Sequence, residues 1–197
     1  MLILKIRRRL AITAIRSIQW FRGVWYRMLS TNRVDGAPVR YQPVQAVGSG
    51  AIKCDRNVRI GVFPSSGFLD TYAYIEARSS TATVCIGENT WINNGFRCIA
   101  EHSLISIGAN CLVGTNVEIL DSDFHGLKLE DRNMSKPEWA APVLVEDNVF
   151  IGSNVRILKG VRIGHGAVIA NSSLVLADVP PMTIAGGVPA KVLRNLN

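Results

Sequence analysis

The sequence predicts an all-β protein whose chain coils into a three-sided parallel solenoid behind an N-terminal helix. The first observation is a strict spacing of six between branched aliphatic residues in the C-terminal part of the chain. The second is the same spacing in two earlier stretches, separated from the first by one aperiodic loop. The third is an N-terminal run of thirty residues that mixes basic and apolar side chains and has no acidic one.

The hexad spacing is clearest from residue 145 onward. The branched residues are Val145, Ile151, Ile157, Ile163, Ile169 and Val175, and the residues four positions after them are Val149, Val155, Val161, Ala167, Ser173 and Val179. A period of six fits neither an α-helix nor the alternation of an ordinary strand. It indicates a triangular coil in which each hexapeptide supplies one strand and one corner. We therefore expect Val145 beneath Ile163, Ile151 beneath Ile169 and Ile157 beneath Val175.

The same register recurs earlier in the chain, so the solenoid is expected over residues 54–180. The positions are Cys54, Ile60, Ile86, Ile92, Cys98, Ile107, Val113 and Ile119. Residues 31–53 are then a linker and 181–197 a closing segment. Residues 124–142 contain two prolines and no period, which predicts an excursion loop, and loops of this length are often functional. Glycines 152, 160, 164 and 166 fall near corners, where a missing Cβ permits positive φ.

Charge is concentrated at the N-terminus. Residues 1–30 carry seven of the 22 basic residues, and the remainder of the chain is formally neutral, which argues against a nucleic-acid-binding face. The segment is expected to form a basic amphipathic helix that lies at a membrane surface or packs on the domain or a sister subunit. Its apolar stretches are too short to span a bilayer.

Cysteine usage indicates a reducing, cytoplasmic compartment. Cys54, Cys85, Cys98 and Cys111 form no C-x-x-C pair, and no secretory cleavage pattern follows the N-terminus. Cys54 and Cys98 occupy inward aliphatic positions and Cys111 a position for small residues. We therefore expect all four to be unreactive thiols of the core.

Three motifs carry a family resemblance. They are hexads that begin I-G-x-N, a D-x-D-x-H-G entry to the excursion loop at residues 121–126, and the closing run VPPMTIAGGVPAKVLR at 179–194. Together they resemble the hexapeptide-repeat acetyltransferases of the maltose, galactoside and polysaccharide O-acetyltransferase group over about residues 54–194. The resemblance implies a left-handed parallel β-helix, a homotrimer, and acetyl-CoA bound in the groove between neighbouring solenoids.

Acetyl transfer to an alcohol requires a base, and imidazole exchanges protons near neutral pH. His125 stands where the coil breaks into the loop and matches the family's catalytic His, although Gly126 follows where the family more often has proline. Asp121 and Asp123 are candidates to orient it, because alternation along an extended segment would place both on the side of His125. A backbone carbonyl is the other candidate, and our hypothesis names Asp123.

The remaining site residues are implied by the resemblance. Asn94 matches a family Asn beside the catalytic His of the neighbouring subunit, and His102 matches a position that contacts the acceptor, with a plain corner residue as the alternative. His165 is expected to be only a corner residue. The residues implied for acetyl-CoA are Gly152, Ser153, Asn171, Leu176, Lys191 and Arg194. Leu176 and Ala177 stand where the family often has Thr-Lys.

The predicted activity is transfer of an acetyl group to a sugar hydroxyl of a surface glycan, such as lipopolysaccharide or capsule, or of its precursor. N-acetylation of an amino sugar on a nucleotide and a non-catalytic scaffold remain the alternatives. A three-His metal enzyme on the same solenoid is disfavoured, because the three histidines are 23 and 40 residues apart. No metal is expected.

Overall fold

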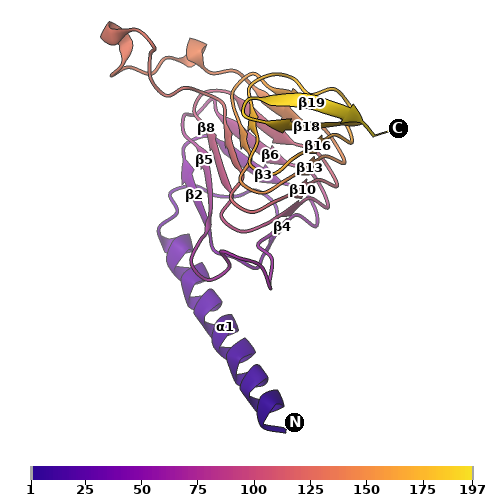
Figure 1. Cartoon of the computed structure of the whole chain (residues 1–197). Coiled ribbons are helices and arrows are strands. Elements are labelled where there is room, and N and C mark those ends of the chain that lie inside the picture. Colours follow the sequence, from indigo (N-terminus) through magenta and orange to yellow (C-terminus); the bar gives the residue numbers. More distant parts are fainter. Residues whose placement is uncertain (1, 197) are drawn as a thin grey trace.

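The computed structural model describes residues 2–196 and begins with a long helix. Helix α1 (Leu2–Met28) is the helical segment expected over residues 1–30. It extends away from the remainder of the molecule towards its N-terminus (Figure 1). Within residues 2–196, no helix combines the length and the apolar character that crossing a membrane requires.

Three sheets, parallel except for the last strand β19, form the sides of a prism. The eight-stranded sheet contains, in spatial order, β1 (Val39–Arg40), β4 (Arg59–Ile60), β7 (Trp91–Ile92), β10 (Leu112–Val113), β13 (Phe150–Ile151), β16 (Val168–Ile169), β18 (Thr183–Gly187) and β19 (Ala190–Asn195). The six-stranded sheet contains β17 (Leu174–Val175), β14 (Arg156–Ile157), β11 (Glu118–Leu120), β8 (Arg97–Ala100), β5 (Ala73–Ala77) and β2 (Val44–Gly48). The five-stranded sheet contains β15 (Arg162–Ile163), β12 (Val143–Val145), β9 (Leu104–Ile107), β6 (Thr83–Ile86) and β3 (Ala51–Cys54).

The register is the predicted one. Val145 pairs with Ile163, Ile151 with Ile169, and Ile157 with Val175. The earlier hexads continue the same columns: Ile86 pairs with Ile107, Ile92 with Val113, and Cys98 with Ile119. All of these side chains are buried in one continuous core. Identical positions on successive coils therefore stack inside the prism, as the period of six requires.

The solenoid begins earlier than predicted. Strands β1 and β2 lie within residues 31–53, which the sequence had suggested to be a linker, and β3 begins there and ends at Cys54. Strand β2 pairs over its whole length with β5, and β3 with β6. The hexad pattern is lost here because residues 61–72 form an insertion between β4 and β5, which lengthens the coil without breaking the hydrogen-bond ladder. Periodicity thus marks regular coils and misses the irregular first one.

Asparagines as well as glycines turn the corners. Asn57, Asn89, Asn110, Asn148 and Asn154 adopt positive φ between 56° and 60°, a region in which asparagine is enriched among residues with a side chain. Gly160 and Gly166 have positive φ as expected, at 75° and 65°. Gly152 and Gly164 do not, contrary to the prediction. A Cβ on either would lie 2.4–2.5 Å from an atom of the next coil, so the requirement there is close approach.

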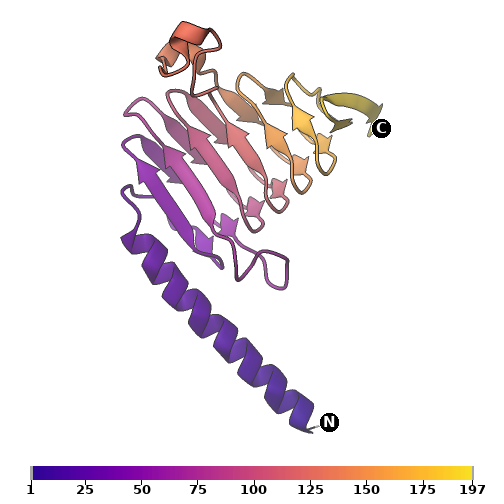
Figure 2. The same cartoon turned by 60° about the vertical axis from the view of Figure 1, so that its left-hand side comes forward.

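The excursion loop lies between β11 and β12. It contains two 3₁₀ turns, η1 (Leu129–Asp131) and η2 (Pro137–Trp139), and projects from the side of the prism (Figure 2). The closing segment forms β18, which pairs parallel with β16, and β19, which folds back antiparallel on β18. The coils thus run from β2 beside α1 to β18 and β19 at the far end (Figure 2).

The corners of successive coils form three edges of the prism. Edge 1 joins the eight- and six-stranded sheets and contains residues 93–96, 114–117, 152–155 and 170–173. Edge 2 joins the six- and five-stranded sheets and contains residues 78–82, 101–103, 121–142 and 158–161. Edge 3 joins the five- and eight-stranded sheets and contains residues 87–90, 108–111, 146–149 and 164–167.

Candidate active site

His125 lies on edge 2, exposed, at the base of the excursion loop. Its Nδ1 is 2.8 Å from the backbone carbonyl oxygen of Arg132, seven residues further along the same loop. A carbonyl oxygen can only accept, so this bond places the ring proton on Nδ1 and leaves the lone pair on Nε2. The loop therefore holds the imidazole in the tautomer that can take a proton at Nε2.

Asp123 does not orient His125, contrary to the hypothesis. Its Oδ2 accepts a 2.6 Å hydrogen bond from Nζ of Lys159, on the next coil of edge 2. The expected alternation fails because Phe124 has φ of 62°, which turns the chain sharply between Asp123 and His125. The carbonyl of Arg132 occupies the orienting position instead.

Asp121, the other candidate to orient His125, belongs to the corner beneath the excursion loop. Its side chain is fully buried, and its carboxylate accepts hydrogen bonds from three consecutive backbone N–H groups, those of Glu101, His102 and Ser103, at 2.7, 3.1 and 2.7 Å. It thereby closes the corner beneath the excursion loop. Asp121 supports the loop from below and does not contact His125.

An ion cluster of two buried carboxylates and one exposed guanidinium lies beside Phe124. The Arg78 guanidinium is 4.9 Å from the centroid of the Phe124 ring. Its Nε donates to Glu76 at 2.7 Å, and its Nη1 donates to Glu101 at 3.2 Å. Sequence reasoning missed this cluster, because Glu76 on β5 and Arg78 just after the strand show only the alternation of an ordinary strand. The cluster supports the bend that precedes His125.

The structure explains why Gly126 follows His125, where the family more often has proline. Its N–H lies 3.2 Å from the carbonyl oxygens of both Asp131 and Met134, bonds that a proline could not make. A Cβ at this position would lie 2.2 Å from the Cβ of Asp131. The loop therefore requires glycine after His125 in this chain.

The other two histidines lie on different corners. His102 is half-buried on edge 2, one coil before the excursion loop, where its backbone N–H binds Asp121. It therefore shares the edge of His125. His165 is exposed on edge 3, where its backbone N–H donates to Glu146 at 2.6 Å. His165 is remote from the edge of His125, in agreement with its expected role as a corner residue.

Asn94 lies on edge 1, so the chain does not bring it together with His125. It is fully buried, and its Oδ1 accepts from the N–H of Val62 at 3.0 Å. Its Nδ2 donates to the carbonyl oxygens of Val62 and Ser66, at 3.0 and 2.9 Å. Within one chain, Asn94 anchors the inserted segment 61–72 to edge 1.

Three of the residues implied for acetyl-CoA lie together on edge 1. Asn171 Oδ1 accepts from the N–H of Ser153 at 2.8 Å, and the same oxygen would be 2.4 Å from a Cβ on Gly152. Leu176 lies beyond β17, at the start of edge 2, and is exposed. Successive coils of edge 1 are thus joined at this point by the bond between Ser153 and the exposed residue Asn171.

Lys191 and Arg194 are exposed on β19, at the last coil. Lys191 pairs with Gly186, and Arg194 with Ile184. Both cations are free of ion pairs within residues 2–196. They therefore place positive charge at the end of the prism.

Cys54, Cys98 and Cys111 are core thiols, whereas Cys85 is half-buried and lies outside the core, contrary to the expectation for it. Burial is the largest cause of a raised pKa in all four thiols, and it raises the pKa of Cys54 to about 12. The ionised thiolate is thereby disfavoured. Residues 2–196 contain no group of three or more His, Cys, Asp or Glu side chains that could hold a metal ion.

An exposed histidine thus stands at a break in a parallel β-helix, and acetyl-CoA residues implied by the sequence lie on a neighbouring edge. Two family models match the chain: the bacterial transferase hexapeptide (six repeats) over residues 142–177, and the hexapeptide repeat of succinyl-transferase over residues 104–132. These two stretches carry hexapeptide repeats of the kind that the models describe, and the chain folds as a left-handed parallel β-helix.

Curated relatives match over part of their length. Galactoside O-acetyltransferase of Escherichia coli is 34% identical over 116 residues, which cover 59% of this chain and 56% of that protein. A tetrahydropyridine-dicarboxylate N-acetyltransferase of Staphylococcus aureus is 49% identical over 59 residues, 30% of this chain and 25% of that protein. The chain spans about half the length of the first curated relatives it matches.

Solved structures match more of the chain. A hexapeptide-repeat acetyltransferase of Vibrio cholerae, complexed with acetyl coenzyme A, is 27% identical with a TM-score of 0.55, covering 95% of this chain and 90% of that one. A polySia-specific acetyltransferase is 27% identical with a TM-score of 0.58, covering 81% of this chain and 71% of that one.

Proposed function

We propose that this protein transfers an acetyl group from acetyl-CoA to a sugar hydroxyl of a surface glycan, lipopolysaccharide or capsule, or of its precursor. The observation that supports it most is the 2.8 Å contact between His125 Nδ1 and the Arg132 carbonyl. It leaves Nε2 as an exposed base at the entrance to the excursion loop. The V. cholerae neighbour complexed with acetyl coenzyme A and the polySia-specific neighbour support the donor and the acceptor class.

His125 acts as the general base in this proposal. Its Nε2 takes the proton of the acceptor hydroxyl while that oxygen bonds to the acetyl carbon, and the carbon–sulfur bond of the thioester then breaks. The protonated ring returns the proton to the departing sulfur, so the products are an acetyl ester and a thiol. General-base assistance of this kind contributes roughly 10²–10⁴-fold to a rate. The Arg132 carbonyl stabilises the protonated ring by accepting from Nδ1.

Residues on edge 1 and on β19 hold the donor in this proposal. Gly152, Ser153 and Asn171 present backbone and amide groups to the pantetheine, with Leu176 at its side. Lys191 and Arg194 bind the phosphates, because ammonium and guanidinium groups form charge-assisted hydrogen bonds with phosphate oxygens. Their exposure and lack of ion-pair partners in the described chain suit an anionic ligand.

The functional unit we propose is a homotrimer. His125 and His102 lie on edge 2, whereas Asn94 and the acetyl-CoA residues on edge 1 lie across the six-stranded sheet. One chain therefore divides the proposed site between two corners. A neighbouring copy that sets its edge 1 against edge 2 would complete it. Asn94 then acts by holding segment 61–72 beside the partner's base, and His102 contacts the acceptor.

Helix α1 attaches the protein to a membrane surface in this proposal. Seven basic residues and no acidic one over residues 1–30, with exposed Trp20, Phe21 and Trp25, support association with the inner face of the membrane. This would keep a cytoplasmic enzyme beside a glycan that is assembled on a lipid. Packing of the same helix on a sister subunit is the alternative, which a vesicle-binding assay distinguishes.

The test compares His125→Ala with His165→Ala, a matched change of an exposed histidine on edge 3. Acetyl-CoA turnover is screened against free sugars, nucleotide sugars and lipid-linked glycans, and product NMR identifies the atom acetylated. We expect His125→Ala to bind CoA normally and to lose about 10²-fold or more in turnover, while His165→Ala remains active. Equal turnover in the two variants would refute the base assignment, and absence of CoA binding would favour a scaffold.

N-acetylation is the second candidate, because the S. aureus relative is an N-acetyltransferase. The same base could take a proton from an amine. Formation of an amide with a nucleotide-linked amino sugar, and of no ester with any sugar in the screen, would decide for this alternative.

A further inference from the structure

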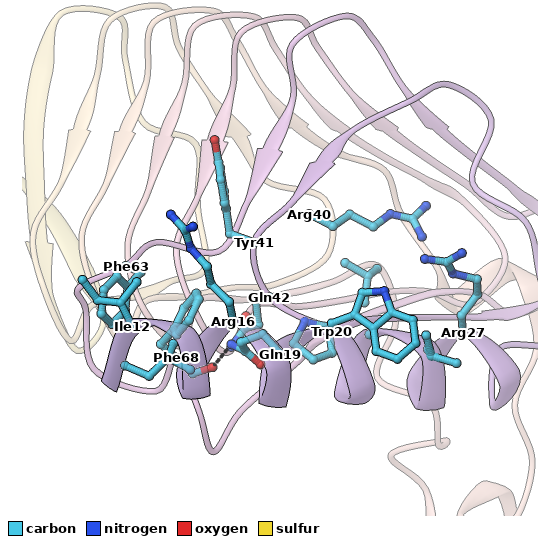
Figure 3. Close-up of a pocket in the computed structure, with 15 residues that line it drawn as sticks. Ile12, Arg16, Gln19, Trp20, Arg27, Arg40, Tyr41, Gln42, Phe63 and Phe68 are labelled. Atoms are coloured by element: carbon cyan, nitrogen blue, oxygen red, sulfur yellow. Dashed lines mark hydrogen bonds between the residues drawn. The ribbon is translucent and has the colours of Figure 1, made fainter. Parts of the chain in front are cut away.

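A cavity of about 600 Å³ lies between α1 and the first coil. Ile12, Ile15, Trp20 and Val24 of α1 form one wall, and the stretch from Arg40 to Val44 forms the other. Phe63 and Phe68 of segment 61–72 close one end (Figure 3). Its volume lies within the range of roughly 300–1,000 Å³ that small-molecule sites occupy.

Specific bonds hold α1 over this cavity. Gln19 Nε2 donates to the carbonyl oxygen of Phe68 at 2.5 Å, and Arg22 Nη2 donates to that of Thr71 at 2.5 Å. The rings of Tyr26 and Tyr72 stack with centroids 4.4 Å apart. The helix is therefore attached to the solenoid by its polar face, and the space beside that face remains open.

The charge of the cavity is of one sign. Arg16, Arg27 and Arg40 line it, and none of the fifteen lining residues is acidic. No ion pair within residues 2–196 involves any of the three. Partial burial and the neighbouring Arg27 lower the pKa of Arg40, so the two guanidiniums repel each other. An anion between them would remove this repulsion and gain charge-assisted hydrogen bonds.

Two cations lie at one end of the cavity, and apolar groups lie at the other end beside Arg16 and Gln19 (Figure 3). Arg27 and Arg40 extend toward each other at one end, and Ile12, Phe63 and Phe68 gather at the other (Figure 3). From Ile12 to Arg27 the helix rises about 22 Å at 1.5 Å per residue. Half of a bilayer's hydrocarbon core is about 15 Å thick. The cavity is thus long enough for one acyl chain with its headgroup.

The surroundings favour a lipid over a water-soluble anion. Trp20, Phe21 and Trp25 expose 65%, 66% and 59% of their surface around the same stretch of α1. Aromatic side chains of this kind are enriched at the interface between headgroups and hydrocarbon. The mouth of the cavity therefore lies where α1 would meet a membrane surface.

We propose that this cavity binds one molecule of an anionic phospholipid, with the phosphate between Arg27 and Arg40 and an acyl chain along Trp20 toward Ile12 and Phe68. The proposal rests on the membrane association proposed above and is independent of acetyl transfer. It assigns to α1 a defined lipid site in addition to a diffuse attraction to negative surfaces.

The test uses the full chain and a lipid that is soluble as a monomer, so that no bilayer is needed. Dihexanoyl phosphatidic acid is titrated by calorimetry into three proteins: the wild type, Arg27→Gln with Arg40→Gln, and Arg7→Gln with Arg8→Gln. The last pair removes the same charge from α1 outside the cavity. Dihexanoyl phosphatidylcholine and inorganic phosphate serve as probes of headgroup charge and of the apolar chain, and thermal unfolding verifies that both variants fold.

We expect the wild type and the Arg7/Arg8 variant to bind phosphatidic acid equally, and the Arg27/Arg40 variant to bind it at least about tenfold more weakly. Phosphatidylcholine and inorganic phosphate should bind more weakly than phosphatidic acid to the wild type. Equal loss in the two variants would overturn the proposal in favour of diffuse attraction. Wild-type binding to anionic vesicles without binding to the soluble lipid would overturn the site and leave membrane association standing.

Discussion

Replacement of Asp121 tests whether one buried carboxylate secures the base of the excursion loop. In Asp121→Ala, the N–H groups of Glu101, His102 and Ser103 lose their acceptor. A buried unsatisfied donor costs about 1–3 kcal/mol, and donors that water can reach cost less, so the sum is roughly 3–5 kcal/mol. In Asp121→Asn, one oxygen can still serve two of the donors, and the expected cost is about 1–3 kcal/mol.

Asp123→Asn is the matched control, because it removes the same charge two residues away. Its contact is a single, partly exposed ion pair with Lys159, and such pairs contribute about 0–1 kcal/mol. For a chain of this length, 1 kcal/mol shifts Tm by about 2–4 °C. We therefore expect roughly 6–20 °C for Asp121→Ala, an intermediate shift for Asp121→Asn, and at most about 4 °C for Asp123→Asn.

Thermal unfolding followed by circular dichroism measures these shifts, and denaturant titration verifies that the unfolding cooperativity is unchanged. The order of the three Tm values is the test: Asp121→Ala should unfold at the lowest temperature, Asp121→Asn at a higher one, and the control Asp123→Asn at the highest. If Asp121→Asn and Asp123→Asn unfolded at the same temperature, the three N–H bonds would not be what stabilises this corner.

Three further changes probe the core, the edge and the ion cluster. Ile151→Ala, at a fully buried position, should cost about 2–5 kcal/mol and Ile151→Val about 0.5–1.5, as measured by denaturant midpoints; equal costs would contradict the stacked core. Gly152→Ala should cost about 1–3 kcal/mol and weaken acetyl-CoA binding in calorimetry, because its Cβ meets Asn171; unaltered stability would argue against close approach at edge 1. Burial acts to raise the pKa of Glu101, but Ser122, Ser135 and Arg78 outweigh it, so the pKa lies below its ordinary value of 4.5. The stabilisation that the ionised Glu101 contributes is present above pH 4.5 and is lost as the pH falls through the lowered pKa. Arg78→Met should therefore reduce the difference in Tm between pH 7 and pH 3. An unchanged difference would exclude the ion pair of Arg78 with Glu101 as the source of this pH dependence.

Periodicity made the coils predictable. A side chain at one hexad position meets its equivalent one turn later, so stacking such as that of Ile151 on Ile169 repeats at a fixed spacing that the sequence displays. The first coil was not recognised, because the insertion at 61–72 changes the spacing while backbone pairing of β2 with β5 tolerates it. Hydrogen-bond ladders leave no trace in side-chain identity.

The sequence allowed the residue proposed as the base to be chosen, but not the contact that orients it. His125 stands at the break of the coil, which the end of the period marks, but its orienting partner is a backbone carbonyl that any residue could supply. Asp123 failed as that partner because the turn at Phe124 depends on Arg78 beneath it, some 46 positions earlier in the chain. Contacts of this range depend on the coiling itself.

The stacking of coils also governs how a chain of this kind can change in length. Each coil hydrogen-bonds only to the coils before and after it, so a deletion or duplication preserves every inward side chain only when it comprises a whole turn. Changes of any other size must be accommodated at a corner, as the insertion at 61–72 and the excursion at 121–142 are. Variation during evolution is thereby directed to the edges, and a new acceptor can be acquired there while the columns of aliphatic residues stay as they are.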